Sequence, residues 1–137
     1  MYDREVKILI IDDDQELRGF YREALLLTLR CSVDEAGDGR EGMARARENC
    51  PDLILLDYVM PAMNGIQFLQ CLRRIPSLCD IPVIVMTSEN DKNEVKRFLL
   101  LGIDGYLVKP ALLTTVVERI VKTIGEEYRL TPSVSQV

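Results

Sequence analysis

The chain has 137 residues, of which 47% are hydrophobic and 28% charged, as is typical of a single globular domain. Its net charge of −5 argues against sequence-independent binding to nucleic acid or to an anionic membrane. Histidine is absent, which excludes Ser–His and Cys–His nucleophile pairs and histidine metal ligands within the chain.

Strand patterns and helix patterns alternate along the chain. In chain order, the predicted elements are strand 6–11, a first helix capped by Asp14, strand 32–36, helix 40–49, strand 53–56, helix 66–74, strand 82–86, helix 92–101, strand 105–108 and helix 112–128. Three of the strands are continuous apolar runs, which is typical of parallel strands buried on both faces.

This βα order, repeated five times, predicts an α/β fold. Parallel strands joined by helical crossovers form a doubly wound five-stranded sheet with helices on both faces. We expect one folded domain over residues 1–128 and a tail or the start of a linker at 129–137, where the composition becomes polar.

The location follows from what the sequence lacks. No apolar run approaches the roughly 18–20 residues that span a bilayer, and the charged N-terminus lacks the apolar stretch of a signal peptide. We therefore expect a cytoplasmic protein that does not enter a membrane. Its four cysteines form no C-x-x-C pair, so we expect reduced thiols at Cys31, Cys50, Cys71 and Cys79.

Polar residues capable of chemistry follow four of the predicted strands. These residues are Asp12, Asp13, Asp14, Asp57, Thr87, Ser88 and Lys109. In a parallel sheet they share one edge, where clustered carboxylates repel one another unless a cation is present. Oxygen ligands of this kind suit Mg²⁺ or Mn²⁺. Asp57 could then act as a carboxylate nucleophile, with Lys109 and Thr87 as donors to a transferred phosphoryl group.

Each of these residues also has an ordinary structural interpretation. Asp14, Thr87 and Ser88 stand where helix caps are common, and Asp57 could be a turn aspartate. Lys109 could be a surface lysine, and Tyr106 a packing aromatic. Their joint placement at four strand ends favours the functional hypothesis.

Six short motifs resemble those of response-regulator receiver domains of two-component signalling. The motifs lie at 8–14, 35–39, 51–57, 60–65, 82–87 and 105–110, and the similarity covers about Val6 to Glu127. The resemblance implies the flavodoxin-like strand order 2-1-3-4-5 of the single-domain chemotaxis regulator and its relatives.

The resemblance also implies a role for each matched residue. Asp12, Asp13 and Asp57, with the backbone carbonyl of Val59, would hold Mg²⁺. Asp57 would be the phosphoacceptor. Thr87 and Lys109 would contact the phosphoryl oxygens. Tyr106 would be an aromatic switch coupled to Thr87. Pro110 would follow a cis peptide bond. Ala111 departs from the phenylalanine common in the family, and Val59 and Glu89 occupy variable positions that influence phosphate lifetime.

Partners follow from the same resemblance. A sensor histidine kinase or a phosphotransfer protein would supply a phosphohistidine, and the chain would catalyse only its own phosphoryl transfer and autodephosphorylation. Phosphorylation would switch partner binding or output activity through the face of the fourth helix, fifth strand and fifth helix, which includes Lys92, Lys96, Tyr106 and Lys122. The cognate kinase, homodimer formation, phosphate lifetime and attachment to an output domain are left open.

Three other classes of protein compete with this hypothesis. A haloacid-dehalogenase-type phosphatase would carry a second aspartate two residues after Asp57, where Val59 stands. A flavodoxin-like cofactor binder would hold phosphate after the first strand, where Asp12, Asp13 and Asp14 would repel it. A degenerate receiver that serves only as a binding module would lack part of the matched site, whereas every matched position is filled.

Overall fold

The computed structural model describes residues 4–58, 60, 63–88 and 92–130. Its strands are β1 (Val6–Ile11), β2 (Cys31–Ala36), β3 (Leu53–Asp57), β4 (Val83–Thr87) and β5 (Gly105–Val108). Its helices are α1 (Gln15–Thr28), α2 (Gly39–Asn49), α3 (Gly65–Arg74), α4 (Lys92–Leu101), α5 (Leu113–Ile124) and the short 3₁₀ helix η1 (Glu126–Tyr128). None of the helices described is long and apolar enough to cross a membrane.

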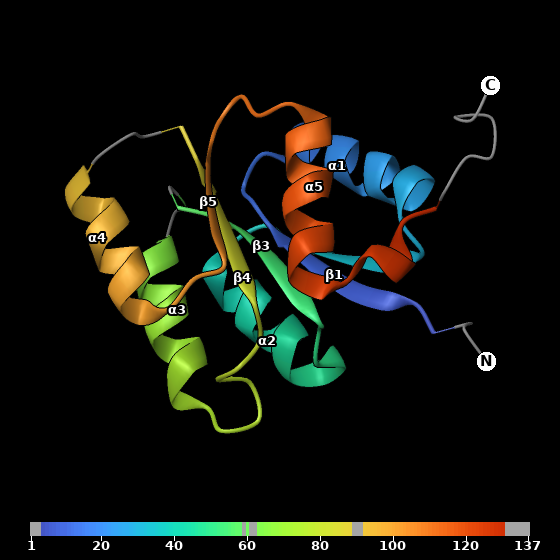
Figure 1. Ribbon diagram of the computed structural model, residues 1–137. Coiled ribbons are helices and arrows are strands. Elements are labelled where there is room, and N and C mark those ends of the chain that lie inside the picture. The colour runs from blue at the N-terminus through green and yellow to red at the C-terminus, as the bar shows by residue number, and fades with distance from the viewer. Residues whose placement is uncertain (1–3, 59, 61–62, 89–91, 131–137) are drawn as a thin grey trace.

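The five strands form one parallel sheet in the order β2-β1-β3-β4-β5 (Figure 1), which confirms the predicted fold and strand order. β1 pairs with both β2 and β3, so the strand order reverses between β1 and β3. The register sets Ile11 beside Leu56, and Asp57 beside Met86. The residues that follow β1, β3 and β4 therefore emerge at the same edge of the sheet.

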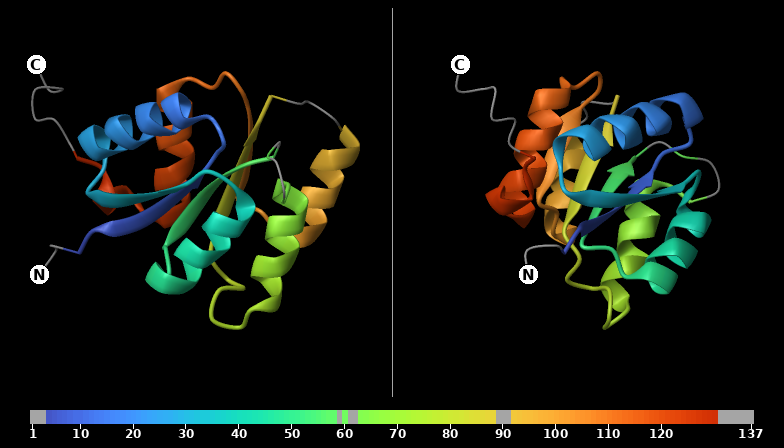
Figure 2. Two further views of the ribbon diagram at one scale, coloured as in Figure 1. Left: turned by 180° about the vertical axis from the view of Figure 1, so that it is seen from behind. Right: turned by 90° about the vertical axis from the view of Figure 1, so that its right-hand side faces the viewer.

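Two hydrophobic cores cover the two faces of the sheet. On one face, Phe68 and Phe98 lead a cluster that joins α2, α3 and α4 to the sheet. On the other, Tyr21, Leu25 and Ile120 lead a cluster that joins α1 and α5 to it. Figure 2 shows α1 and α5 on one side of the sheet and α2 and α3 on the other. Full burial of a large apolar side chain stabilises the fold by about 1.5–3 kcal/mol, so these cores stabilise the sheet that carries the strand ends.

The last helix is shorter than its pattern predicts. The expectation of a helix over 112–128 is wrong, because α5 ends at Ile124 and Gly125 follows with a backbone φ of 126°. That conformation is open to glycine and strained for other residues, so the helix stops there and the chain continues into η1. Gly102, with φ of 82°, ends α4 as predicted.

Arg73 of α3 ties together three segments at the opposite edge of the sheet. Its guanidinium donates to the carbonyls of Cys79 (2.9 Å) and Ile81 (2.8 Å) in the loop before β4. It also donates to the carbonyls of Leu101 (3.2 Å) and Gly102 (2.6 Å) at the C-terminal end of α4. Burial lowers the pKa of this guanidinium, which nevertheless stays charged because an arginine pKa is far above neutral pH.

Substitution of Gly19 by alanine is expected to raise the free energy of unfolding by about 1 kcal/mol, because Gly19 lies inside α1 and a Cβ there would meet no atom within 4 Å. Gly42→Ala in α2 is the matched control, since its Cβ would come within 2.6 Å of the buried Ile11 side chain. The free energy of unfolding of this variant should be lower than that of the parent by about 1–3 kcal/mol. Urea unfolding measures both, and a gain in both variants would contradict the packing argument.

Candidate functional site

Three buried polar side chains lie where β1, β3 and β4 end. Asp12 directly follows β1 and is 4% exposed, Asp57 is the last residue of β3 and is 6% exposed, and Thr87 ends β4 with no exposed surface. Buried carboxylates are costly unless they are paired, so their presence at one sheet edge indicates a site.

The carboxylates converge as the strand pattern predicts. One oxygen each from Asp12, Asp13 and Asp57 lies within 4.8 Å of the others. The backbone N–H of Asp12 donates to the Ala36 carbonyl (3.1 Å), and the N–H of Asp14 donates to an Asp12 carboxylate oxygen (2.9 Å), which fixes the turn that follows β1. Three carboxylate oxygens at this spacing fit a hard divalent cation such as Mg²⁺ or Mn²⁺.

Lys109 reaches into this cluster from the turn after β5. Its Nζ lies 2.7 Å from Asp12 Oδ2 and 3.2 Å from Asp57 Oδ1. Its backbone N–H donates to the Thr87 carbonyl (2.7 Å), which sets β5 against the end of β4. Burial lowers the Lys109 pKa, but the hydrogen bond to Asp12 and the charge of Asp57 outweigh it and raise the pKa. The peptide bond between Lys109 and Pro110 is cis, as the resemblance implies.

Asp57 has the most perturbed carboxyl group of the site. Burial, reinforced by the charge of Asp12, raises its pKa from 3.8 to about 6, although Lys109 opposes the shift. The ionised form is therefore held in a setting that disfavours it. A cation that offsets this negative charge would be bound favourably.

Asp14 follows its structural interpretation. Its side chain accepts a hydrogen bond from the Leu17 N–H (3.1 Å) and caps α1, and the acid cluster above comprises Asp12, Asp13 and Asp57 without it. Three consecutive aspartates thus divide between the carboxylate cluster and the start of a helix.

Tyr106 is half-buried in β5 and packs against α4. Its ring centroid lies 5.9 Å from that of Phe98, which in turn contacts the Tyr58 ring at 5.3 Å. This aromatic row joins the segment after β3 to β5 through α4. Val59 and Glu89, expected beside the site, lie outside the described residues, as does the side chain of Lys92.

Arg18 of α1 belongs to the surroundings of the site, and sequence reasoning missed it. Its Nη1 donates to the carbonyl oxygen of Asp12 (2.7 Å), while its Nε donates to Glu35 of β2 (2.9 Å). A usable signal was its position one helical turn after the cap residue Asp14, which brings the side chain back over the preceding turn.

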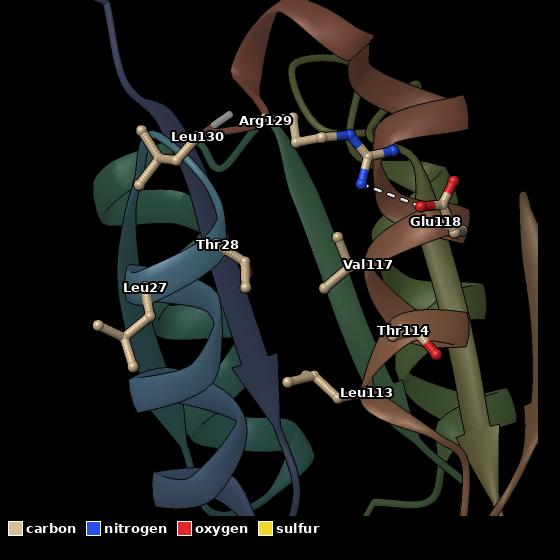
Figure 3. Close-up of a pocket in the computed structure, with 8 residues that line it drawn as sticks. All are labelled: Leu27, Thr28, Leu113, Thr114, Val117, Glu118, Arg129 and Leu130. Carbon is tan, nitrogen blue, oxygen red and sulfur yellow. Dashed lines mark ion pairs between the residues drawn. The ribbon is translucent and has the colours of Figure 1, made fainter. Parts of the chain in front are cut away.

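A hollow lies between α1 and α5, away from the acid cluster, and Figure 3 shows the residues that line it. Leu27 faces it from α1, and Leu113 and Val117 face it from α5. Its volume is about 460 Å³. Its two charged lining residues, Arg129 and Glu118, form an ion pair with each other at 2.9 Å. Its lining is mainly apolar, so we place the chemistry at the strand ends instead.

Most of the chain matches known proteins in sequence. The family model described as "Response regulator receiver domain" matches residues 8–121. The chain is 38% identical over 109 residues to the probable C4-dicarboxylate response regulator DctR of Halalkalibacterium halodurans, covering 77% of this chain and 45% of that protein. It is 34% identical over 114 residues to the transcriptional regulatory protein PrrA of Mycobacterium tuberculosis, covering 83% and 48% respectively.

Other relatives are close to this chain in length. The probable chemotaxis protein CheY of Rhizobium etli is 35% identical over 106 residues, which cover 77% of this chain and 82% of that protein. Among solved structures, the chemotaxis protein CheY4 of Vibrio cholerae superposes with a TM-score of 0.82 at 28% identity, covering 88% of this chain and 99% of that one. The chain thus spans about half the length of DctR and PrrA and most of the length of the two chemotaxis proteins.

Proposed function

Because the chain belongs to the response regulator receiver domains of two-component signalling, we propose that it is a phosphoacceptor switch in which Asp57 takes up a phosphoryl group with the help of Mg²⁺ or Mn²⁺. The observation that carries the proposal is the buried Asp57 carboxylate, which lies beside Lys109 and within 4.8 Å of the oxygens of Asp12 and Asp13. A nucleophile, a cation site and a fixed positive charge are the parts that phosphoryl transfer needs.

In the proposed reaction, an Asp57 carboxylate oxygen attacks the phosphorus of a phosphohistidine on a partner protein. The new O–P bond forms as the P–N bond breaks, and the electron pair of the broken P–N bond stays on the nitrogen of the departing imidazole. The divalent cation, when bound, supplies positive charge that offsets the charge on the phosphoryl oxygens. Lys109 can move its hydrogen bond from the carboxylates to a phosphoryl oxygen, and Thr87 can donate its hydroxyl. These 137 residues contain no histidine, so the donor phosphohistidine would lie outside this sequence.

We propose that phosphorylation changes the structure of the face made by α4, β5 and α5. An aspartyl phosphate carries roughly −1.5 to −2 charge at the end of β3, in place of the single negative charge of the ionised carboxylate. Thr87 and Tyr106 would respond to it, and a partner would read the change at a surface that includes the exposed Lys96 and Lys122. A sensor histidine kinase or phosphotransfer protein would act upstream, in the cytoplasm, and an effector or output domain downstream.

The competing enzyme classes place their key groups elsewhere. A haloacid-dehalogenase-type nucleophile would follow the first strand, whereas Asp57 ends β3. A flavodoxin-like phosphate loop would follow β1, where the carboxylates of Asp12 and Asp13 stand instead. The match over residues 8–121 favours the receiver function over both.

Direct phosphorylation tests the proposal. The purified protein is incubated with Mg²⁺ and a small acyl phosphate, and intact mass spectrometry follows the product. We expect a mass gain of one phosphoryl group that alkali removes, that maps to the peptide containing Asp57, and that disappears when a chelator removes the cation. A gain that survives alkali, or that forms equally well with chelator present, would refute the proposal.

Asp13→Asn is expected to weaken binding of Mg²⁺ by at least about tenfold, because it removes one of the three converging carboxylates. Asp14→Asn is the matched control, since it removes the same charge one residue later and asparagine caps a helix equally well. It should change the affinity by less than about threefold. Calorimetric titration measures both affinities. Equal weakening in the two variants would show that the loss of a negative charge near the site, and not the loss of a ligand, lowers the affinity.

A further inference from the structure

Arg18 connects three parts of the molecule that meet beside the acid cluster. The side chain starts on α1, bonds the backbone carbonyl of Asp12 at 2.7 Å and bonds the Glu35 carboxylate of β2 at 2.9 Å. It is 15% exposed, so solvent competes little for these bonds. The guanidinium group is a rigid planar fork, so two bonds in different directions fix its orientation.

The bond to Asp12 acts at the point where the chain leaves the sheet. The Asp12 N–H is held by the Ala36 carbonyl on one side, and the Asp12 carbonyl is held by Arg18 on the other. With both ends of the residue fixed, its peptide planes have little freedom to rotate. The directions of the Asp12 side chain and of the next residue, Asp13, depend on those planes.

Glu35 supplies the other half of the arrangement. It lies one residue before the end of β2 and pairs with Ile10 of β1 in the register of the sheet. Its two oxygens bond Arg18 at 2.9 Å and Arg22 at 3.5 Å. The sheet therefore positions Glu35, and Glu35 in turn aims Arg18 at the turn between β1 and α1.

We propose that Arg18, braced by Glu35, is a positioning residue that holds the turn between β1 and α1 so that the Asp12 and Asp13 carboxylates converge on a divalent cation. The inference rests on the proposed function, because the cation is the ligand that these carboxylates would bind. Arg18 touches neither carboxylate in the described contacts, so it acts through the backbone of Asp12.

Arg22 offers a matched control within the same helix. It lies one turn after Arg18, pairs with the same glutamate and carries the same charge, but within the described part of the chain it makes no bond to the turn after β1. Arg18→Met and Arg22→Met therefore remove equal charge and one Glu35 contact each. They differ in the bond to the Asp12 carbonyl.

The test measures the affinity of the full chain for Mn²⁺ by electron paramagnetic resonance, with no phosphoryl donor present. Arg18→Met should raise the dissociation constant about tenfold, the size of effect found when groups that orient metal ligands are removed. Arg22→Met should change it by less than about twofold. Arg18→Lys keeps the charge but cannot bond both partners in a fixed geometry, so it should restore only part of the affinity.

A second measurement separates positioning from chemistry. The rate of phosphoryl uptake from a small acyl phosphate is followed as the Mg²⁺ concentration is varied. Arg18→Met should need about tenfold more Mg²⁺ to reach half its maximal rate, while the maximal rate itself stays within about twofold of the parent. A fall in the maximal rate with unchanged Mg²⁺ dependence would overturn the inference.

The outcomes are distinguishable from a failure of the proposed function. If the parent binds no Mn²⁺, the proposed function itself is wrong. If the parent binds Mn²⁺ and Arg18→Met binds it equally well, or if both methionine variants are weakened alike, the positioning role alone is wrong. Should Arg18→Met fail to fold, Glu35→Gln serves in its place, because it removes the brace and keeps Arg18. It should weaken Mn²⁺ binding by about threefold, and unchanged binding would overturn the inference.

Discussion

An Asp57→Asn variant is expected to take up no measurable phosphoryl group from an acyl phosphate, a loss of at least about 10³-fold relative to the parent. The amide of asparagine matches the carboxylate in shape, so the site keeps its packing. Its oxygen carries no formal charge and is a poor nucleophile, so no aspartyl phosphate can form. Intact mass spectrometry under saturating Mg²⁺ measures the effect.

Asp52→Asn is the matched control for this loss. Asp52 stands just before β3, at the end opposite Asp57, and its carboxylate bonds Arg4 (2.8 Å) and the Lys7 N–H (2.8 Å). The same chemical change at that end should leave uptake at the level of the parent. Uptake by Asp57→Asn equal to the parent, with the added mass on another residue, would show that the acceptor is wrongly assigned.

The same Asp57→Asn variant is expected to be more stable than the parent by about 2–3 kcal/mol near pH 7.5 when no divalent cation is present. Burial and the charge of Asp12 raise the Asp57 pKa from 3.8 to about 6, and each unit of pKa shift corresponds to about 1.4 kcal/mol. Asparagine resembles the protonated acid, so the variant avoids the cost of holding the ionised carboxylate in the folded state.

The stability difference between Asp57→Asn and the parent changes with pH in a definite direction. Below a pH of about 3.8 the Asp57 carboxyl is protonated in both the folded and the unfolded chain, so parent and variant should differ little. Between that pH and about 6 the unfolded chain releases this proton first, and the parent loses stability as the pH rises. Above about pH 6 the difference should be constant.

Urea unfolding at about pH 4.5 and about pH 7.5 tests this expectation. Asp14→Asn is the control, because the Asp14 side chain caps α1 and lies outside the three-carboxylate cluster. Added Mg²⁺ should stabilise the parent more than Asp57→Asn, since a ligand that binds the folded state raises its stability by mass action. A variant that is less stable than the parent near pH 7.5 would contradict the argument.

The fold could be predicted because the strands carry an unusually clear pattern. The apolar residues 53–56 of β3 are buried along their whole length, and the middle of a buried parallel strand accepts little else than apolar residues. The strand order came from the family resemblance, since periodicity alone does not say which strands are neighbours. The end of α5 was misplaced because Glu126, Glu127 and Tyr128 continue the helical composition past Gly125.

The site could be predicted to the extent that topology places it. Parallel strands bring their carboxyl ends together, which is sufficient to gather Asp12, Asp57 and Lys109. The partners of Arg18 could not be predicted, because a long flexible side chain has many possible destinations and only the packing of α1 against β2 selects one. The roles of Thr87 and Tyr106 in switching stay predictions.

The four hydrogen bonds that Arg73 donates hold the C-terminal end of α4 in place. The guanidinium clasps the C-terminal end of that helix to α3 and to the loop before β4. Hydrogen bonds from a charged group contribute about 1.5–3 kcal/mol each, so several must break before that end can shift. We therefore expect any shift of α4 to pivot at Leu101 and Gly102, the end that Arg73 holds.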